Sequence, residues 1–142
     1  MHTVAHLLKA KGNKIFSVAP TDTVLHAVEL MATAHVGALL VMDQGVLKGI
    51  ISERDYARKV ILMHRASHDT PVTDIMTSPA VTVTPERTVH ECMQIMTERR
   101  FRHLPVVDKG RVVGMLSIGD LVKAVIEDQS KTIEDLERYI AG

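Results

Sequence analysis

The sequence predicts a mixed α/β (α+β) chain built from two β-α-β-β-α repeats. Residues 49–55 and 114–120 both have the pattern Gly-apolar-apolar-Ser-x-x-Asp, and the second copy follows the first by 65 residues. Residues 20–55 also align with residues 85–120 without a gap. A repeat that covers most of a chain takes precedence over other fold signals. The identical residues, numbered in the first copy, are Pro20, Thr23, Val24, Met31, Leu39, Val41, Asp43, Gly45, Gly49, Ser52 and Asp55.

The chain before the repeats predicts a short helix and an extended segment. Residues 2–11 have apolar side chains on one side and end at Gly12, which is typical of an amphipathic helix. We expect this helix to cap one edge of the fold. Residues 13–18 are predicted to be extended, and Pro-Thr-Asp at residues 20–22 indicates the start of the next helix.

Each repeat then alternates between helical and extended patterns. Apolar residues at helical spacing predict one helix in each copy, and two short apolar runs joined at a glycine predict a hairpin. A second helix follows the serine of each Gly-apolar-apolar-Ser-x-x-Asp stretch. The helices carry Val24, Ala27, Val28 and Met31, or Val89, Cys92, Met93 and Met96; the strands are 38–42 with 46–51, and 104–107 with 111–116; the second helices are 53–64 and 118–128.

Segments outside the repeats are shorter. Residues 65–71 are polar and turn-prone, and residues 72–76 predict a short helical piece. Residues 132–141 predict a further helix, with Ile133, Leu136 and Ile140 on one side. Its apolar stripe needs a cover, which is either its own domain or a partner chain.

Composition restricts the function. The chain has 142 residues, 46% of them apolar, and a net charge of zero, so no global field attracts nucleic acid or an anionic membrane. No apolar run approaches the length of a membrane span, and the N-terminus is too short and polar for a signal peptide. The single cysteine cannot form an internal disulfide. A cytoplasmic location is therefore expected.

The Ser-x-x-Asp stretches are the strongest functional signal. A helix N-terminus has unpaired N–H groups and a partial positive charge, which suit a phosphate. An aspartate in the first turn can accept hydrogen bonds from vicinal sugar hydroxyls. The alternative is an ordinary capping box, a common structural pattern. We expect Asp55 and Asp120 to lie at exposed helix starts.

These residues resemble a tandem pair of cystathionine β-synthase (CBS) domains, the arrangement called a Bateman module. The resemblance rests on the doubled Asp-x-Gly-x3-Gly-x2-Ser-x2-Asp frame and on Asp74-Ile75-Met76-Thr77 before the second copy, and it covers residues 13–128. It implies two repeats packed sheet to sheet about a pseudo-twofold axis. The implied division is a capping helix at 1–12, repeats at 13–66 and 77–128, a linker at 67–76, and a C-terminal helix at 129–142.

In such modules each of two clefts tends to bind an adenosine-containing ligand, with the aspartate of one repeat on the ribose and residues of the other repeat beside the base. The resemblance implies one cleft formed by Asp55, Arg54 and Ser52 facing Ser78, Pro79, Phe101, Arg102 and His103. The other is implied to contain Asp120, Gly119 and Ser117 facing Asn13, Lys14, Val36 and Gly37.

The predicted function is a regulatory sensor that binds AMP, or ADP, ATP or NAD(H), without catalysis and without a metal. Arg102 and His103 come directly before a buried strand, where they can contact phosphate, whereas Arg99 and Arg100 can equally be a solvated helix end. The Asp55 cleft is therefore expected to have the stronger phosphate field, with Lys14 the nearest cation of the Asp120 cleft. The alternative function is a structural dimerisation module with vestigial clefts.

A homodimer is also expected, because Bateman modules commonly pair through their helices, and an unidentified regulated protein is a further candidate partner; no nucleic acid or membrane partner is expected. The predicted seam contains Val60, Ile61, Val122 and Val125.

Other reactive residues receive weaker interpretations. The His2/His6 and His64/His68 pairs have metal-ligand spacing but few accompanying carboxylates or thiols, so we interpret them as surface histidines. Cys92 lies on the apolar side of a helix without a clear base, which favours core packing over nucleophilic chemistry.

Overall fold

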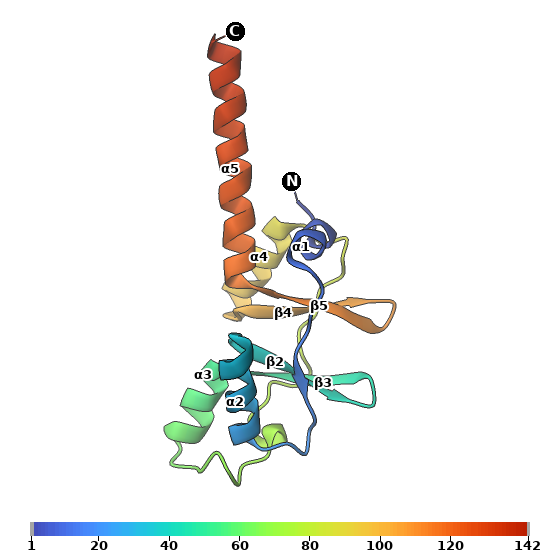
Figure 1. Ribbon diagram of the computed structural model, residues 1–142, viewed down its shortest axis with the longest axis vertical. Coiled ribbons are helices and arrows are strands. Elements are labelled where there is room, and N and C mark those ends of the chain that lie inside the picture. The colour runs from blue at the N-terminus through green and yellow to red at the C-terminus, as the bar shows by residue number, and fades with distance from the viewer. Residues whose placement is uncertain (1, 142) are drawn as a thin grey trace. The chain divides into compact units, whose positions relative to one another are not determined.

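The computed structural model describes residues 2–141. Met1 and Gly142, the first and last residues of the predicted terminal segments, lie outside the described residues. The chain divides into two compact units (Figure 1). The first-repeat unit comprises residues 14–81, and the second-repeat unit comprises residues 82–141 together with the N-terminal residues 2–13. The N-terminal helix therefore belongs to the unit of the second repeat, although the two are far apart in the sequence.

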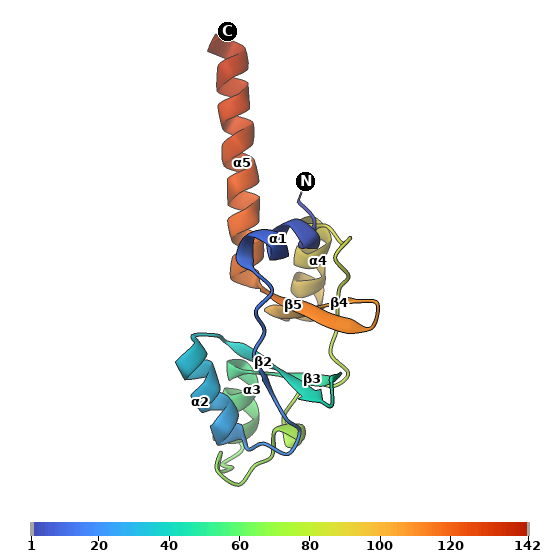
Figure 2. The ribbon, with the colours of Figure 1, turned by 45° about the vertical axis from the view of Figure 1, so that its right-hand side comes forward.

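The first-repeat unit is a three-stranded sheet with helices on one side (Figures 1 and 2). Strand order is β1-β2-β3, with β1 parallel to β2 and β2 antiparallel to β3. Its elements are β1 (Ser17–Val18), α2 (Val24–Ala34), β2 (Ala38–Asp43), β3 (Val46–Ser52), α3 (Glu53–Tyr56), the π-helical turn η1 (Ala57–Ile61) and the 3-10 turn η2 (Val72–Asp74).

The second-repeat unit has a two-stranded antiparallel sheet, with α1, α4 and α5 on one side of it (Figure 2). The strand that corresponds to β1 is reduced to a parallel bridge between Val83 and Val106. The elements are α1 (Val4–Lys11), α4 (Val89–Arg99), β4 (His103–Asp108), β5 (Arg111–Ser117) and α5 (Ile118–Ala141).

Both hairpins have the two-residue turn that the sequence predicts. Gln44 and Gly45 have φ of 50° and 79°, and Lys109 and Gly110 have 51° and 79°. Positive φ at both central residues defines a type I′ turn, whose twist matches the flanking strands. Each hairpin also has a register shift between Val41 and Met42, or between Val106 and Val107, directly after the pair that contains Gly49 or Gly114. The two copies therefore agree in backbone detail as well as in sequence.

Side chains at helical and strand spacing form the core of each unit. In the first-repeat unit, Val24, Ala27 and Met31 of α2 pack with Leu39 and other buried residues. In the second-repeat unit the equivalent Val89, Cys92, Met96 and Leu104 are at most 3% exposed. The predicted helix faces are confirmed.

Several predicted boundaries are wrong for identifiable reasons. Helix α2 begins at Val24 with Thr23 as its N-cap, because the Asp22 carboxylate instead accepts a hydrogen bond from the Ala19 N–H (2.8 Å) and closes the preceding turn. The helix predicted for residues 53–64 changes to π-helical geometry after Tyr56 and ends at Ile61.

The separate helices predicted for residues 118–128 and 132–141 are one continuous helix, α5. The intervening residues are polar but include no glycine or proline, so nothing interrupts the backbone ladder. The Thr132 hydroxyl donates back to the Asp128 carbonyl (3.0 Å), as a threonine within a helix can.

Helix α1 is tied to the second-repeat unit by backbone and side-chain contacts. Its Val4 N–H donates to the Arg87 carbonyl (2.8 Å), and Val4 is fully buried. Leu8 packs so closely on β5 that a Cβ at Gly114 would lie 2.6 Å from Leu8 Cδ2. This docking fixes the C-terminal end of α1, where Lys11 lies, relative to β5.

Candidate functional site

The Asp120 carboxylate closes a reciprocal cap at the start of α5. The Ser117 N–H donates to Asp120 Oδ2 (2.8 Å), and the Asp120 N–H donates to Ser117 Oγ (3.2 Å). Ser117 is the last residue of β5 and Ile118 the first of α5, so the strand delivers the cap directly to the helix. The structure thus confirms that this motif is a helix cap. Whether the same carboxylate also binds a ligand depends on other features of the site.

The Asp55 carboxylate has the same role at the start of α3. Asp55 Oδ2 accepts from the Ser52 N–H (2.9 Å) and from Ser52 Oγ (3.0 Å), and the Asp55 N–H donates to Ser52 Oγ (3.2 Å). Side-chain exposure is 14% for Asp55 and 25% for Asp120. The expectation of exposed carboxylates is therefore wrong, because each is folded back over its own strand end.

The segment before the first hairpin strand lies against each helix start. The Glu53 N–H donates to the Gly37 carbonyl (3.0 Å), and the Ile118 N–H donates to the Arg102 carbonyl (2.8 Å). His103 is the register partner of Ser117, as Ala38 is of Ser52. Each unit therefore brings its own pre-strand residues beside its own Ser-x-x-Asp motif.

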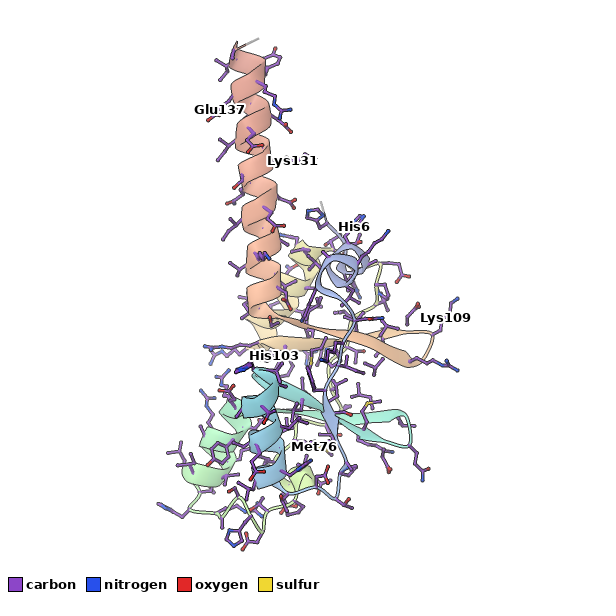
Figure 3. The ribbon with its side chains drawn as sticks, viewed as in Figure 1. His6, Met76, His103, Lys109, Lys131 and Glu137 are labelled. Atoms are coloured by element: carbon purple, nitrogen blue, oxygen red, sulfur yellow. The ribbon has the colours of Figure 1, made fainter. Side chains whose placement is uncertain are left out.

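Lys11 is the residue at this site that sequence reasoning missed. Its Nζ donates to Asp120 Oδ2 (2.6 Å) and to the Met115 carbonyl (2.7 Å) (Figure 3 shows this unit with its side chains). Lys11 therefore pairs directly with Asp120, and the expectation that Lys14 is the nearest cation is wrong. Instead, Lys14 lies over the Phe16 ring, 5.1 Å from its centroid, in the first-repeat unit.

Asp55 has a lysine partner on η1, the π-helical turn that continues α3. Lys59 Nζ lies 3.1 Å from Asp55 Oδ1, and Lys59 Nζ also donates to the Ile75 carbonyl (2.9 Å). The i, i+4 spacing of an acid followed by a lysine could have predicted this pair from the sequence. The Lys11 contact has no such local signal.

The charges around Asp120 set the protonation states of the site. Burial raises the pKa of Asp120, but hydrogen bonds from Lys11 and the Ser117 N–H outweigh it, and the pKa lies below its usual value. Burial lowers the pKa of His103; Lys11 and Arg102 act in the same direction, and Asp120 opposes them. His103 is therefore neutral at neutral pH, and Lys11 and Arg102 supply the positive charge.

The other predicted site residues occupy the following positions. Ser78 and Pro79 are exposed, and Ser78 Oγ donates to the Lys48 carbonyl (2.7 Å). Arg54, Arg102, Asn13, Lys14 and Gly119 are exposed, whereas Phe101, Val36 and Gly37 are half-buried. The assignment of these residues to two opposed clefts stays a prediction.

The remaining reactive groups have structural roles. Burial, followed by the Glu91 charge, raises the pKa of Cys92 to about 11, so its thiol is unreactive at neutral pH. His2 Nε2 lies 2.8 Å from Asp128 Oδ1, a carboxylate partner that sequence reasoning missed. Among residues 2–141, no three His, Cys, Asp or Glu residues are placed to hold a metal ion.

Comparison with known families identifies the repeats. A family model described as CBS domain matches residues 12–62 and again residues 72–127. The chain belongs to the CBS domain family. Because each match covers one repeat, the chain contains a tandem CBS pair, as the sequence predicts.

Relatives of this CBS pair have been found by sequence and by structure. It is 42% identical over 149 aligned residues to CBSX3, a mitochondrial CBS domain-containing protein of Arabidopsis thaliana, with 99% of this chain and 72% of that protein covered. A solved CBS-domain structure from Burkholderia ambifaria is 51% identical, with a TM-score of 0.87 over 90% of this chain and 96% of that one. PAE2072 from Pyrobaculum aerophilum, a CBS domain protein solved in complex with AMP, is 26% identical, with a TM-score of 0.79 over 92% and 99%.

Location was predicted only by default. None of the helices within residues 2–141 combines the length and the apolar character needed to cross a bilayer. The cytoplasmic location stays a prediction.

Proposed function

We propose that this CBS pair is a regulatory sensor module that binds an adenosine-containing ligand at each Ser-x-x-Asp helix start, without catalysis. AMP is the first candidate, and ADP, ATP and NAD(H) are the others. The observation that carries the proposal is the gathering, in the second-repeat unit, of a half-buried carboxylate, a helix N-terminus and the Lys11 ammonium. The Arg102 backbone is held at the same helix start, and the Arg102 charge acts on His103.

Each group has a distinct role toward such a ligand. The Asp120 carboxylate, kept ionised by its low pKa, accepts hydrogen bonds from the two vicinal ribose hydroxyls. The N-terminal end of α5 and the charges of Lys11 and Arg102 favour a phosphate. His103, neutral in the free protein, supplies an imidazole hydrogen bond rather than a charge. In the first-repeat unit, Asp55, Ser52 and Lys59 offer the equivalent carboxylate, cap and cation.

The AMP complex of PAE2072 supports the ligand class, since that protein is a relative with the same fold. The further contacts implied by the family resemblance belong to the proposal, except that Arg102 and His103 are given to the ligand at Asp120, the motif of their own unit, instead of the ligand at Asp55. We also propose that the ligand-loaded module acts on a partner protein.

A second function is favoured by a specific observation. Both carboxylates already close helix caps and pair with lysines, so they are satisfied without a ligand. A structural dimerisation module with vestigial sites would have the same arrangement. Ligand binding must therefore replace or share the Lys11–Asp120 hydrogen bond, whereas a structural module would keep it under all conditions.

A thermal-shift panel separates the two functions. A ligand that binds only the native state at about 100 times its Kd stabilises the protein by about 2.7 kcal/mol. We expect AMP, or one of ADP, ATP, NAD(H) and S-adenosylmethionine, to raise the melting midpoint. The 2′-deoxy analogue of AMP should raise it less, because it lacks one hydroxyl for the carboxylate. No shift with any of these ligands would support the structural module instead.

A further inference from the structure

Helix α5 carries an exposed apolar stripe along nearly its whole length. The exposed fractions are 41% for Val122, 56% for each of Ile126, Ile133 and Leu136, and 82% for Ile140. Every described residue from 129 to 141 is exposed, and this part of α5 extends beyond the rest of its unit (Figure 1). Isolated apolar residues on a surface are ordinary, but a continuous stripe indicates an interaction surface.

The stripe follows the spacing of a coiled-coil seam. Successive positions 122, 126, 129, 133, 136 and 140 are separated by four, three, four, three and four residues. This is the a and d pattern of a heptad repeat, with isoleucine at a positions 126, 133 and 140, and with Gln129 as the one polar member. From residue 122 to residue 140 the seam is about 27 Å long at 1.5 Å per residue.

The seam is separate from the face by which α5 packs in its own unit. Leu121 is fully buried and Ala124 is 2% exposed, and Asp128 pairs with His2 on the same side. Val122 and Ile126 lie between these residues in sequence but remain exposed. The packed half of α5 therefore has a second face open for another helix.

We propose that the α5 seam pairs with the α5 seam of a second copy of this chain in an antiparallel arrangement. The register that aligns the two seams end to end places Ile126 opposite the partner's Leu136, Gln129 opposite the partner's Ile133, and Val122 opposite the partner's Ile140. All six a and d layers are then filled, and the pairing is the same for both copies, as a twofold dimer requires.

Charge complementarity selects the antiparallel direction. Residues at e positions flank the partner's e positions in an antiparallel pair, which brings Lys123 beside the partner's Glu137 and Glu137 beside the partner's Lys123. On the other flank, the g positions bring Val125 beside the partner's Tyr139, which is 86% exposed in the single chain. A parallel pair would instead place Glu137 beside Thr132 and leave Lys123 without an opposite charge. Glu137 is labelled on the projecting part of α5 in Figure 3.

Sedimentation of the full chain at about 20 micromolar tests the pairing. The wild type should sediment at twice the monomer mass of 15.7 kDa. Leu136→Glu should weaken the dimer at least tenfold, while its melting curve should keep the native cooperativity because Leu136 makes no core contact. Leu62→Glu is the matched control, since Leu62 is 68% exposed but lies outside α5.

The direction is tested by charge exchange and by cross-linking. Lys123→Glu and Glu137→Lys should each weaken the dimer, and the double variant should recover it. Ile126→Cys alone should not form a disulfide-linked dimer, because the two copies of residue 126 would lie about 15 Å apart along the helix. A mixture of Ile126→Cys and Leu136→Cys should cross-link. Buried Cys92 does not compete.

Three results would overturn the proposal. The first is a monomeric wild type, which would leave the seam to another partner. The second is a dimer that Leu62→Glu breaks and Leu136→Glu does not. The third is a disulfide-linked dimer of Ile126→Cys alone, which would show a parallel pair.

Discussion

At the scale of single residues, Lys11 and Asp120 have the largest consequences. The Lys11 ammonium donates to the carboxylate at 2.6 Å, and this hydrogen bond joins α1 to the start of α5. The same contact helps to lower the pKa of Asp120 and, through its charge, the pKa of His103. One lysine from outside the repeats therefore contributes to the electrostatics of a repeat motif, together with burial and the Ser117 hydrogen bonds.

The Lys11–Asp120 pair should make stability depend on pH. A carboxylate whose folded pKa is lowered contributes stability above its unfolded pKa of about 3.9, and this contribution is lost as pH falls through the folded value. We expect Lys11→Met to cost about 1 kcal/mol at pH 7, since both side chains are partly exposed, and progressively less below about pH 4. Urea unfolding at several pH values measures this. Lys9→Met, on the same last turn of α1, is the control, and an equal loss for Lys11→Met at pH 7 and pH 3 would contradict the explanation.

Arg102 should distinguish phosphate from nucleoside. Its backbone carbonyl accepts a hydrogen bond from the Ile118 N–H at the start of α5, and the residue is exposed. Arg102→Ala should weaken AMP binding by roughly 1.5–3 kcal/mol, the usual contribution of a hydrogen bond to a charged group, and should leave adenosine binding nearly unchanged. Competition titrations measure both affinities, with Arg111→Ala as a control at the exposed start of β5. Equal losses for AMP and adenosine would refute the role.

At the scale of elements, Gly49 and Gly114 occupy equivalent strand positions but face different neighbours. A Cβ at Gly49 would lie 2.7 Å from the Thr77 carbonyl oxygen, which accepts a hydrogen bond from the Ile50 N–H (3.0 Å). A Cβ at Gly114 would lie 2.6 Å from the end of the Leu8 side chain, which can rotate. The same repeat residue therefore packs on rigid backbone in one unit and on a flexible side chain in the other.

This difference predicts unequal costs of substitution. Gly49→Ala should destabilise the protein by about 3 kcal/mol, and Gly114→Ala by about 1 kcal/mol, within the range for overpacking. Gly119→Ala is the control, because its Cβ would meet only Ser117 Oγ at 3.6 Å. Chemical denaturation of the three variants measures the order. A larger loss for Gly114→Ala than for Gly49→Ala would show that Leu8 cannot move aside.

The sequence predicted elements where local chemistry determines them. The paired apolar runs and the turn glycines Gly45 and Gly110 were sufficient for both hairpins. Val60, predicted at a dimer seam, is 1% exposed and belongs to the core. Apolar spacing alone could not decide which partner a helix face would meet. The Lys11–Asp120 contact spans 109 residues and follows from the docking of α1, which no local pattern shows.

At the scale of the whole molecule, two copies of one motif occur in different surroundings. Asp55 pairs with Lys59 of the adjoining turn η1, and Asp120 pairs with Lys11 of α1, which is far away in the sequence. The two sites should therefore bind ligands with unequal affinity. The sequence predicts the stronger phosphate field at Asp55, with Arg102 and His103 opposite it. Lys11 weakens that expectation, because it adds a positive charge at Asp120.

Calorimetric titration of AMP into the wild type and three alanine variants tests the ligand role of the two aspartates most directly. Glu91 provides the matched control, because it closes the α4 capping box with Thr88 just as Asp120 closes its cap with Ser117, and no ligand role is proposed for it. Loss of a cap costs about 0.5–2 kcal/mol, so all three variants should melt earlier. We predict two binding events for the wild type and for Glu91→Ala, and one for each of Asp55→Ala and Asp120→Ala. If both aspartate variants melt early and still bind AMP at full stoichiometry, these carboxylates are helix caps and do not hold the ligand.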